Sequence, residues 1–114
     1  MKVSEIKEML AETGFPVTYG AWEEQGVPEL PYIVWDLPGS ENFGADDGVY
    51  KEVETLRVEL YAMRRSFAAE KRVEAVLDAY CIFWDKTSVW IDAEDMNQTS
   101  YTMDIFIEEE NNGE

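Results

Sequence analysis

The sequence predicts an α+β fold in which two helices pack on one face of an antiparallel β-sheet of about five to six strands. Two segments repeat apolar residues with a helical period, and most other segments alternate or are rich in β-branched and aromatic residues. The chain has 114 residues, enough for one hydrophobic core but not for two. We expect the order α-β-β-β-α-β-β-β within one domain at 1–107, followed by an acidic disordered tail at 108–114.

The first predicted element is a short helix near the N-terminus. Ser4 is a suitable N-cap, because its hydroxyl can accept a hydrogen bond from a free N–H of the first turn. Apolar residues then recur at the i, i+3, i+4 spacing of one helix face: Ile6, Met9 and Leu10. Gly14 stands where a residue with left-handed backbone geometry often follows a helix. We therefore expect this helix to end before Gly14.

Three strands are predicted between the two helices. A short strand at 17–19 and a second at 32–35 are rich in β-branched and aromatic residues, and Pro38 and Gly39 end the second. A longer strand at 49–63 alternates clearly. Its two faces consist of Leu56, Val58, Leu60 and Ala62 on one side, and Thr55, Arg57, Glu59 and Tyr61 on the other. One face of this strand is expected to be buried.

The period then changes to that of a helix. Ser66 is a suitable N-cap, and the apolar positions that follow are Ala69, Val73, Val76, Leu77 and Tyr80. After this helix, 82–84 and 88–91 are expected to pair as a hairpin around 85–87. A turn near 93–97 leads to a last strand at 101–107.

The charge balance excludes several classes of partner. There are 25 acidic and 9 basic residues, and the formal net charge is −16. Such a surface repels phosphate, so general nucleic-acid binding and docking on an anionic membrane are not expected. No apolar run approaches the ~20 residues that span a bilayer.

Histidine is absent and Cys81 is the one cysteine, which leaves no Ser–His or Cys–His pair. We expect no enzyme activity, no cofactor and no metal site, and we expect Cys81 to be buried in the core and the chain to be assembled in a reducing cytoplasm. Acids near Gly48 and at 92–95 lack the spacing of an EF-hand loop.

Several segments together resemble the small tail-completion proteins of long-tailed bacteriophages and Gram-positive prophages. The segments are ELPYIVW at 29–35, PGSENFGAD at 38–46, VYK at 49–51, VELY at 58–61, EKRVEAVLD at 70–78 and IFWDKT at 82–87. They cover nearly the whole chain, although none is a chemical motif by itself.

The resemblance implies a tail terminator or a head–tail joining subunit, and both roles fit these residues. It implies a ring, hexameric when assembled, at the head-proximal end of the tail tube. The partners would be other copies of the chain, tail tube proteins and head-completion or connector proteins. The protein would reside in the virion after assembly in the host cytoplasm, and DNA would pass through the channel without specific binding.

Three groups of residues are candidates for subunit or partner contacts. They are Asn42, Phe43, Asp46 and Asp47 in a long loop predicted at 38–48, the basic group Arg64, Arg65, Lys71 and Arg72, and Trp22 and Trp90. The alternatives are a loop folded back on its own sheet, a solvated helix face with i, i+4 ion pairs, and tryptophans that only fill the core. We expect Trp35 and Trp84 to pack in the core.

A second class of function also fits the charge. An acidic binding module could mimic nucleic acid and inhibit a DNA-binding host protein. The acids, however, are scattered over ordinary helix and strand surfaces, whereas a mimic needs them arrayed like phosphates.

Overall fold

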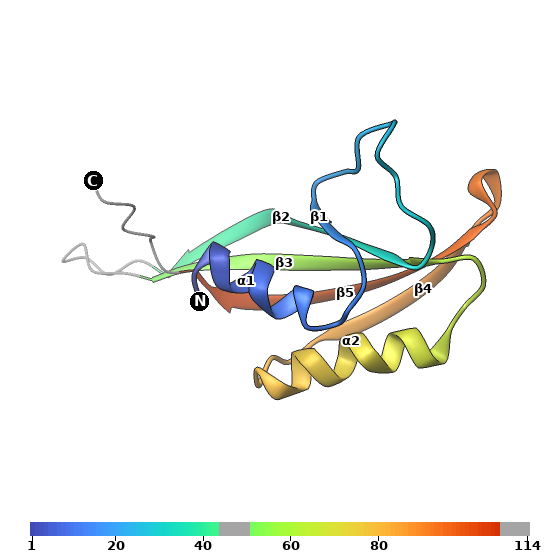
Figure 1. Cartoon of the computed structure of the whole chain (residues 1–114). Helices are drawn as coiled ribbons and strands as arrows, with labels where there is room; N and C mark the ends of the chain where they lie inside the picture. Colours follow the sequence, from blue (N-terminus) through green and yellow to red (C-terminus); the bar gives the residue numbers. More distant parts are fainter. Residues whose placement is uncertain (44–50, 108–114) are drawn as a thin grey trace.

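The computed structural model describes residues 1–43 and 51–107, which form a five-stranded sheet with both helices on one face (Figure 1). The elements are α1 (Val3–Ala11), β1 (Val17–Tyr19), β2 (Tyr32–Phe43), β3 (Lys51–Ala62), α2 (Phe67–Ala79), β4 (Asp85–Ile91), the 3₁₀ turn η1 (Asp92–Glu94) and β5 (Met96–Phe106). The strand order in the sheet is β1-β2-β3-β5-β4. The predicted α+β class is confirmed.

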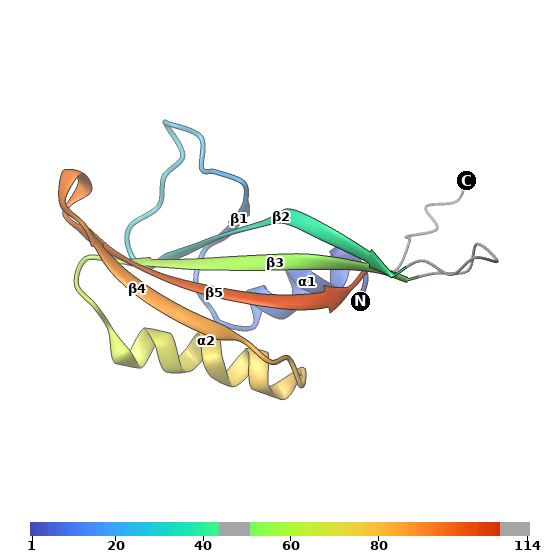
Figure 2. The ribbon, with the colours of Figure 1, turned by 180° about the vertical axis from the view of Figure 1, so that it is seen from behind.

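The sheet is antiparallel except at one edge, where β1 runs parallel to β2. Figure 2 shows from behind how β2, β3 and β5 run side by side through the middle of the molecule. Register aligns Trp35 of β2 with Val58 of β3, and Val58 with Tyr101 of β5. One row of large side chains therefore crosses three strands on the face that the helices cover.

The core lies between this face and the two helices. On α1 the apolar stripe Ile6, Met9 and Leu10 is fully buried, as the helical spacing predicts. Val73 and Leu77 of α2 are also fully buried. The predicted alternation of β3 is confirmed, because Leu56, Val58, Leu60 and Ala62 are all buried, whereas the residues between them are half-buried.

The prediction of a loop at 38–48 is wrong in its first part. The strand β2 continues to Phe43, and its register with β3 shifts between Asp36 and Gly39. Pro38, which has no N–H to donate, lies inside this shift, where a bulge accommodates it. Residues 44–48 of the predicted loop lie outside the described residues.

The start of α1 also differs from the prediction. The N-cap is Lys2 and not Ser4. The Glu5 carboxylate accepts a hydrogen bond from the backbone N–H of Lys2 at 2.8 Å, the reciprocal contact of a capping box. Glu5 thus stabilises a start two residues earlier than Ser4 would. Gly14 does adopt the expected left-handed geometry, with φ of +83°.

The predicted hairpin at 82–84 and 88–91 is wrong, and the chain has one strand fewer after α2 than predicted. Cys81 has φ of +58° and Ile82 donates to the Leu77 carbonyl at 3.1 Å, so the chain turns at the helix end. One continuous strand, β4, follows. Cys81 is exposed on this turn, which corrects the prediction that it is buried.

The last strand begins five residues earlier than predicted. Asp95 has φ of +51° and ends η1, and β5 starts at Met96. The β4–β5 connection is therefore tight, and the two strands that it joins pair in antiparallel fashion.

Candidate subunit interface

Two of the four predicted loop residues lie in a strand. Asn42 and Phe43 end β2, where register places them opposite Glu52 and Lys51 of β3. Asp46 and Asp47 lie outside the described residues. Asn42 and Phe43 are therefore strand residues at the end of the β2–β3 pair and not loop residues. Their role in partner contact stays a prediction.

The four clustered basic residues do not form one patch. The Arg65 Nε atom lies 3.0 Å from a carboxylate oxygen of Glu70. Arg72 donates to the Thr13 carbonyl and stacks over the Phe15 ring. Arg64 and Lys71 are exposed and form no hydrogen bond or ion pair within the part of the chain that the structure describes. Arg65 and Arg72 thus hold α2 in place, and Arg64 and Lys71 remain available for contacts.

Sequence reasoning missed a polar cluster between α2 and the sheet. Glu70 is only 1% exposed and accepts hydrogen bonds from Arg65 and, at 3.1 Å, from Lys86 of β4. Lys86 also binds Glu74 at 2.7 Å, and Glu74 accepts a hydrogen bond from the Tyr101 hydroxyl at 2.8 Å. The sequence did contain a signal for this cluster. Glu70 and Glu74 are an i, i+4 pair, and Glu70 directly follows Ala69, a buried position of the helix.

The same cluster perturbs several pKa values, among them those of Glu70 and Tyr101. Burial would raise the pKa of Glu70, but the hydrogen bonds and charges of Arg65 and Lys86 outweigh burial and lower it. Burial, followed by the hydrogen bond to Glu74, raises the pKa of Tyr101. This cluster keeps its charges paired, so its chemistry is that of a structural clamp.

The sheet face opposite the helices carries a second polar row. Arg57 of β3 binds Asp36 of β2 through two hydrogen bonds of 3.0 and 2.7 Å. Gln98 of β5 donates to Glu59 at 2.7 Å and to the Tyr61 hydroxyl at 2.8 Å. Burial raises the pKa of Glu59, and Arg57 partly offsets this. These satisfied polar groups suit a face that meets water or a polar partner.

The tryptophans divide between core and surface. Trp35 is 1% exposed, as predicted, whereas Trp84 is only half-buried and packs edge-on against Tyr101. Trp22 is half-buried against Tyr32, with ring centroids 5.7 Å apart, and its buried indole N–H has no acceptor among the described residues. Trp90 is 47% exposed, and its indole N–H donates to Asp92 at 3.0 Å.

Large apolar side chains are exposed at several places on the described surface. They are Tyr19, Val27, Met63, Phe67, Phe83, Val89, Trp90 and Phe106. Met63 and Trp90 share a shallow groove with Leu30, Arg64 and Asp95. The structure thus brings together two predicted contact residues, Arg64 and Trp90, that are far apart in sequence.

A second groove, of about 600 Å³, lies between α1 and β1. It is lined by Lys7, Ala11, Gly14, Phe15, Val17, Thr18, Tyr19 and Trp35. Its lining contains one cation and no carboxylate, although acids greatly outnumber bases in the chain.

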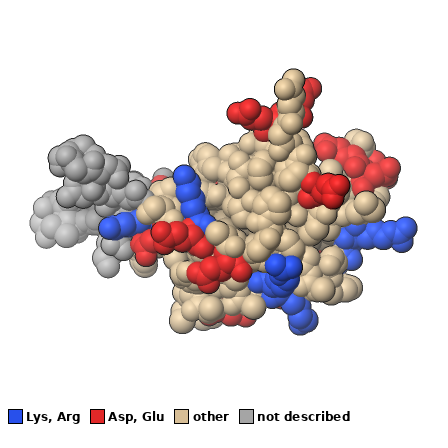
Figure 3. Space-filling model, viewed as in Figure 1, with Lys and Arg blue, Asp and Glu red and all other residues tan. Residues whose placement is uncertain are grey.

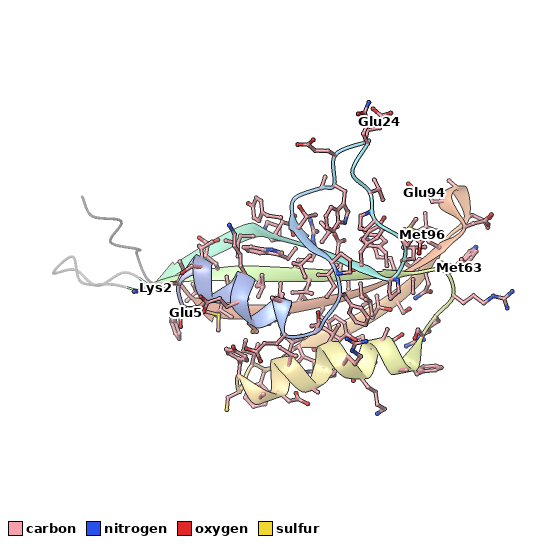
Figure 4. The ribbon with its side chains drawn as sticks, viewed as in Figure 1. Lys2, Glu5, Glu24, Met63, Glu94 and Met96 are labelled. Carbon is pink, nitrogen blue, oxygen red and sulfur yellow. The ribbon has the colours of Figure 1, made fainter. Side chains whose placement is uncertain are left out.

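Carboxylates gather in three places on the face shown in Figure 3, which are α1, the β1–β2 connection and the surroundings of η1. Figure 4 places Glu24 and Glu94 at the tips of the last two segments. The described residues contain no group of three or more histidine, cysteine or acidic residues placed to hold a metal ion. No described helix is long and apolar enough to cross a membrane.

Comparison with known proteins bears on the fold. Neither a scan against protein-family models nor a search of curated proteins found a match. Among solved structures, the chain is similar to one described as "Virion of native gene transfer agent (GTA) particle", with a TM-score of 0.57 and 16% sequence identity. The likeness covers 86% of this chain and 82% of that chain. At this identity the likeness shows a shared fold.

Proposed function

We propose that this protein is a structural subunit of a phage-like virion, which forms a ring at the head-proximal end of the tail tube. Its role would be tail termination and completion, or head–tail joining. The observation that carries the proposal is the fold shared with a chain of a gene transfer agent virion over most of both chains. The resemblance of the sequence segments to tail-completion proteins points in the same direction.

The surface supports a function by contact rather than by chemistry. The exposed apolar side chains lie on both helix-side and sheet-side elements, so more than one surface is available for partners. A closed ring of identical copies needs two different, complementary surfaces on each copy. In the cluster around Glu70 and in the polar row around Arg57, carboxylates are paired with basic side chains.

The negative charge has a function in this setting. A ring around a DNA channel benefits from a wall that repels phosphate, and the formal net charge of −16 provides such a wall if part of it faces the lumen. Acids replaced by lysine on a lumen surface would then slow DNA ejection.

Electron microscopy of particles made without this protein tests the proposal. Tail tubes of uncontrolled length would identify a terminator, and finished tails detached from full heads would identify a joining protein. Normal, infective particles would contradict both roles. Salt-sensitive capture of a DNA-binding host protein by the purified chain would favour the acidic-decoy function instead.

A further inference from the structure

We infer that two copies of this chain associate head-to-tail, with the Trp90–Asp92 pair of one copy entering the groove between α1 and β1 of the next. The inference rests on the proposed ring function for its setting. It names the two surfaces that such a ring would join. We call them the basic groove (Lys7, Phe15, Thr18 and Tyr19, with Arg72 stacked on Phe15 beside it) and the acidic end (Trp90, Asp92, Glu94 and Asp95).

The basic groove combines an aromatic floor with a positive rim. Tyr19 is 56% exposed and packs edge-on against Trp35, with ring centroids 4.8 Å apart. Phe15 lies under the Arg72 guanidinium at 4.2 Å. Lys7 is exposed at the rim and forms no hydrogen bond or ion pair with the described residues. An aromatic ring with a nearby carboxylate is the ligand chemistry that suits this surface.

The acidic end presents that chemistry. The exposed indole of Trp90 is held by its hydrogen bond to Asp92, so ring and carboxylate form one ordered unit. Glu94 and Asp95 are exposed beside it. Tryptophan is the residue most enriched among interface anchors, and an ordered side chain loses less entropy on binding.

The two surfaces lie where neighbouring copies in a ring would meet. The basic groove adjoins β1 and the acidic end adjoins β4, and these are the opposite edges of the sheet. Trp90 lies on the same face of β4 as Lys86, and Lys86 binds Glu70 on the helix α2. The groove lies beside the other helix, α1. Both surfaces are therefore on the helix side of the sheet. Copies placed side by side would bring unlike surfaces together, as a heterologous contact requires.

Charge favours this pairing over a two-fold dimer. Two acidic ends repel one another, and two basic grooves would pair Lys7 with Lys7, whereas a head-to-tail contact places acids against Lys7 and Arg72. The contact is partly exposed, so raised ionic strength should weaken it.

Cysteine crosslinking tests the contact directly. Cys81 is exposed and is first replaced by serine, which leaves no thiol in the chain. Thr18→Cys in the groove and Ala93→Cys in η1 then leave every charge of the proposed contact intact. With a short bismaleimide in concentrated solution, the doubly substituted protein should form a ladder of dimers, trimers and larger products. Either cysteine alone can give no product larger than a dimer.

Charge variants and a matched pair complete the experiment. Lys7→Glu should reduce the trimers and larger products roughly tenfold, and adding Glu94→Lys should restore them. Trp90→Ala should abolish them. The pair Ala79→Cys with Ala93→Cys, which moves one thiol to the far end of α2, should give no trimers or larger products. A ladder no stronger than that of the matched pair, or one unaffected by Lys7→Glu, would overturn the inference.

The inference and the proposed function fail separately. Ring-shaped virion components that contain this protein, but yield no Thr18→Cys to Ala93→Cys product, would overturn the head-to-tail contact and leave the function intact. A clear ladder from a protein that is absent from tailed particles would overturn the function and leave the contact intact.

Discussion

The Lys86 ammonium lies 3.1 Å from the Glu70 carboxylate and so joins the edge strand β4 to the first turn of the helix α2. Glu70 is 1% exposed, whereas the side chain of Lys86 keeps 28% of its surface exposed. A carboxylate this deeply buried is tolerated because Arg65 and Lys86 both donate to it. The helix is thus attached to the sheet by a charged contact as well as by its apolar stripe.

Replacing Glu70 by alanine should therefore destabilise the fold. We expect a loss of about 1–3 kcal/mol in the free energy of unfolding, because Arg65 loses its acceptor and the buried site loses its hydrogen bonds. The loss stays below that of a fully buried pair, since Lys86 keeps Glu74 as a partner. Urea unfolding followed by circular dichroism measures it. The exposed Lys71→Ala is the control, and equal stability of the two variants would contradict the role given to Glu70.

The same carboxylate should contribute a defined pH dependence. Its folded-state pKa is lowered by Arg65 and Lys86, so ionised Glu70 stabilises the folded state above its unfolded pKa of about 4.3. This contribution disappears as the pH falls from there through the lowered folded-state pKa. We expect the stability difference between the native protein and Glu70→Gln to be constant from neutral pH down to about 5 and to shrink below about 4.3. A difference that persists or grows in acid would refute this.

The tryptophans offer a test that separates core from surface. Trp35→Ala should cost about 3–5 kcal/mol, because the indole is almost fully buried and its removal leaves a cavity. Trp90→Ala should change stability by about 0.5 kcal/mol or less, since that ring is half exposed. Thermal and denaturant unfolding of both variants would measure this contrast. A large loss of stability in Trp90→Ala would mean that the ring serves the fold rather than a partner.

The sequence predicted the elements with strong periodicity and failed where partners are distant in the chain. The α2 stripe, the Ser66 cap and the β3 alternation are local patterns, and local geometry alone determines which face they bury. The apparent strand at 82–84 consists of three apolar residues in a row, but Phe83 is 96% exposed and no strand that the structure describes pairs with this segment. A short apolar and aromatic run does not show that a neighbouring strand exists.

Only the folded structure distinguishes candidate contact residues that bind within the fold from those that stay exposed. Arg65 and Arg72 look like Lys71 in the sequence, yet they bind Glu70 and the Thr13 carbonyl within the fold. The groove between α1 and β1 depends on packing between elements and has no sequence signature. Whether the predicted residues meet a partner remains a prediction.

The N-cap of α2 allows a prediction about the stability contributed by a single hydrogen bond. Ser66 Oγ accepts a hydrogen bond from the Ala69 N–H at 3.1 Å. Ser66→Ala should lower the free energy of unfolding by about 1 kcal/mol, because that N–H loses its acceptor. Ser66→Asp keeps an acceptor and favours the positive helix end, so it should retain the native stability. Equal losses in both variants would show that the hydroxyl matters for a reason other than capping.

Gly14 and Gly20 allow backbone strain to be distinguished from crowding. Both have left-handed geometry, with φ of +83° and +81°, so alanine at either position should cost about 1–2 kcal/mol. A Cβ at Gly20 would meet no atom of the described residues within 4 Å, whereas one at Gly14 would collide with the Arg72 guanidinium. Gly14→Ala should therefore cost more than Gly20→Ala, since Arg72 must leave the Thr13 carbonyl.

A double-mutant cycle isolates that crowding. In an Arg72→Ala background the collision is gone, so Gly14→Ala and Gly20→Ala should have the same effect on the free energy of unfolding, and only the cost of the left-handed backbone should remain. If Gly14→Ala stays the more damaging change without Arg72, the extra cost comes from the connection between α1 and β1 itself.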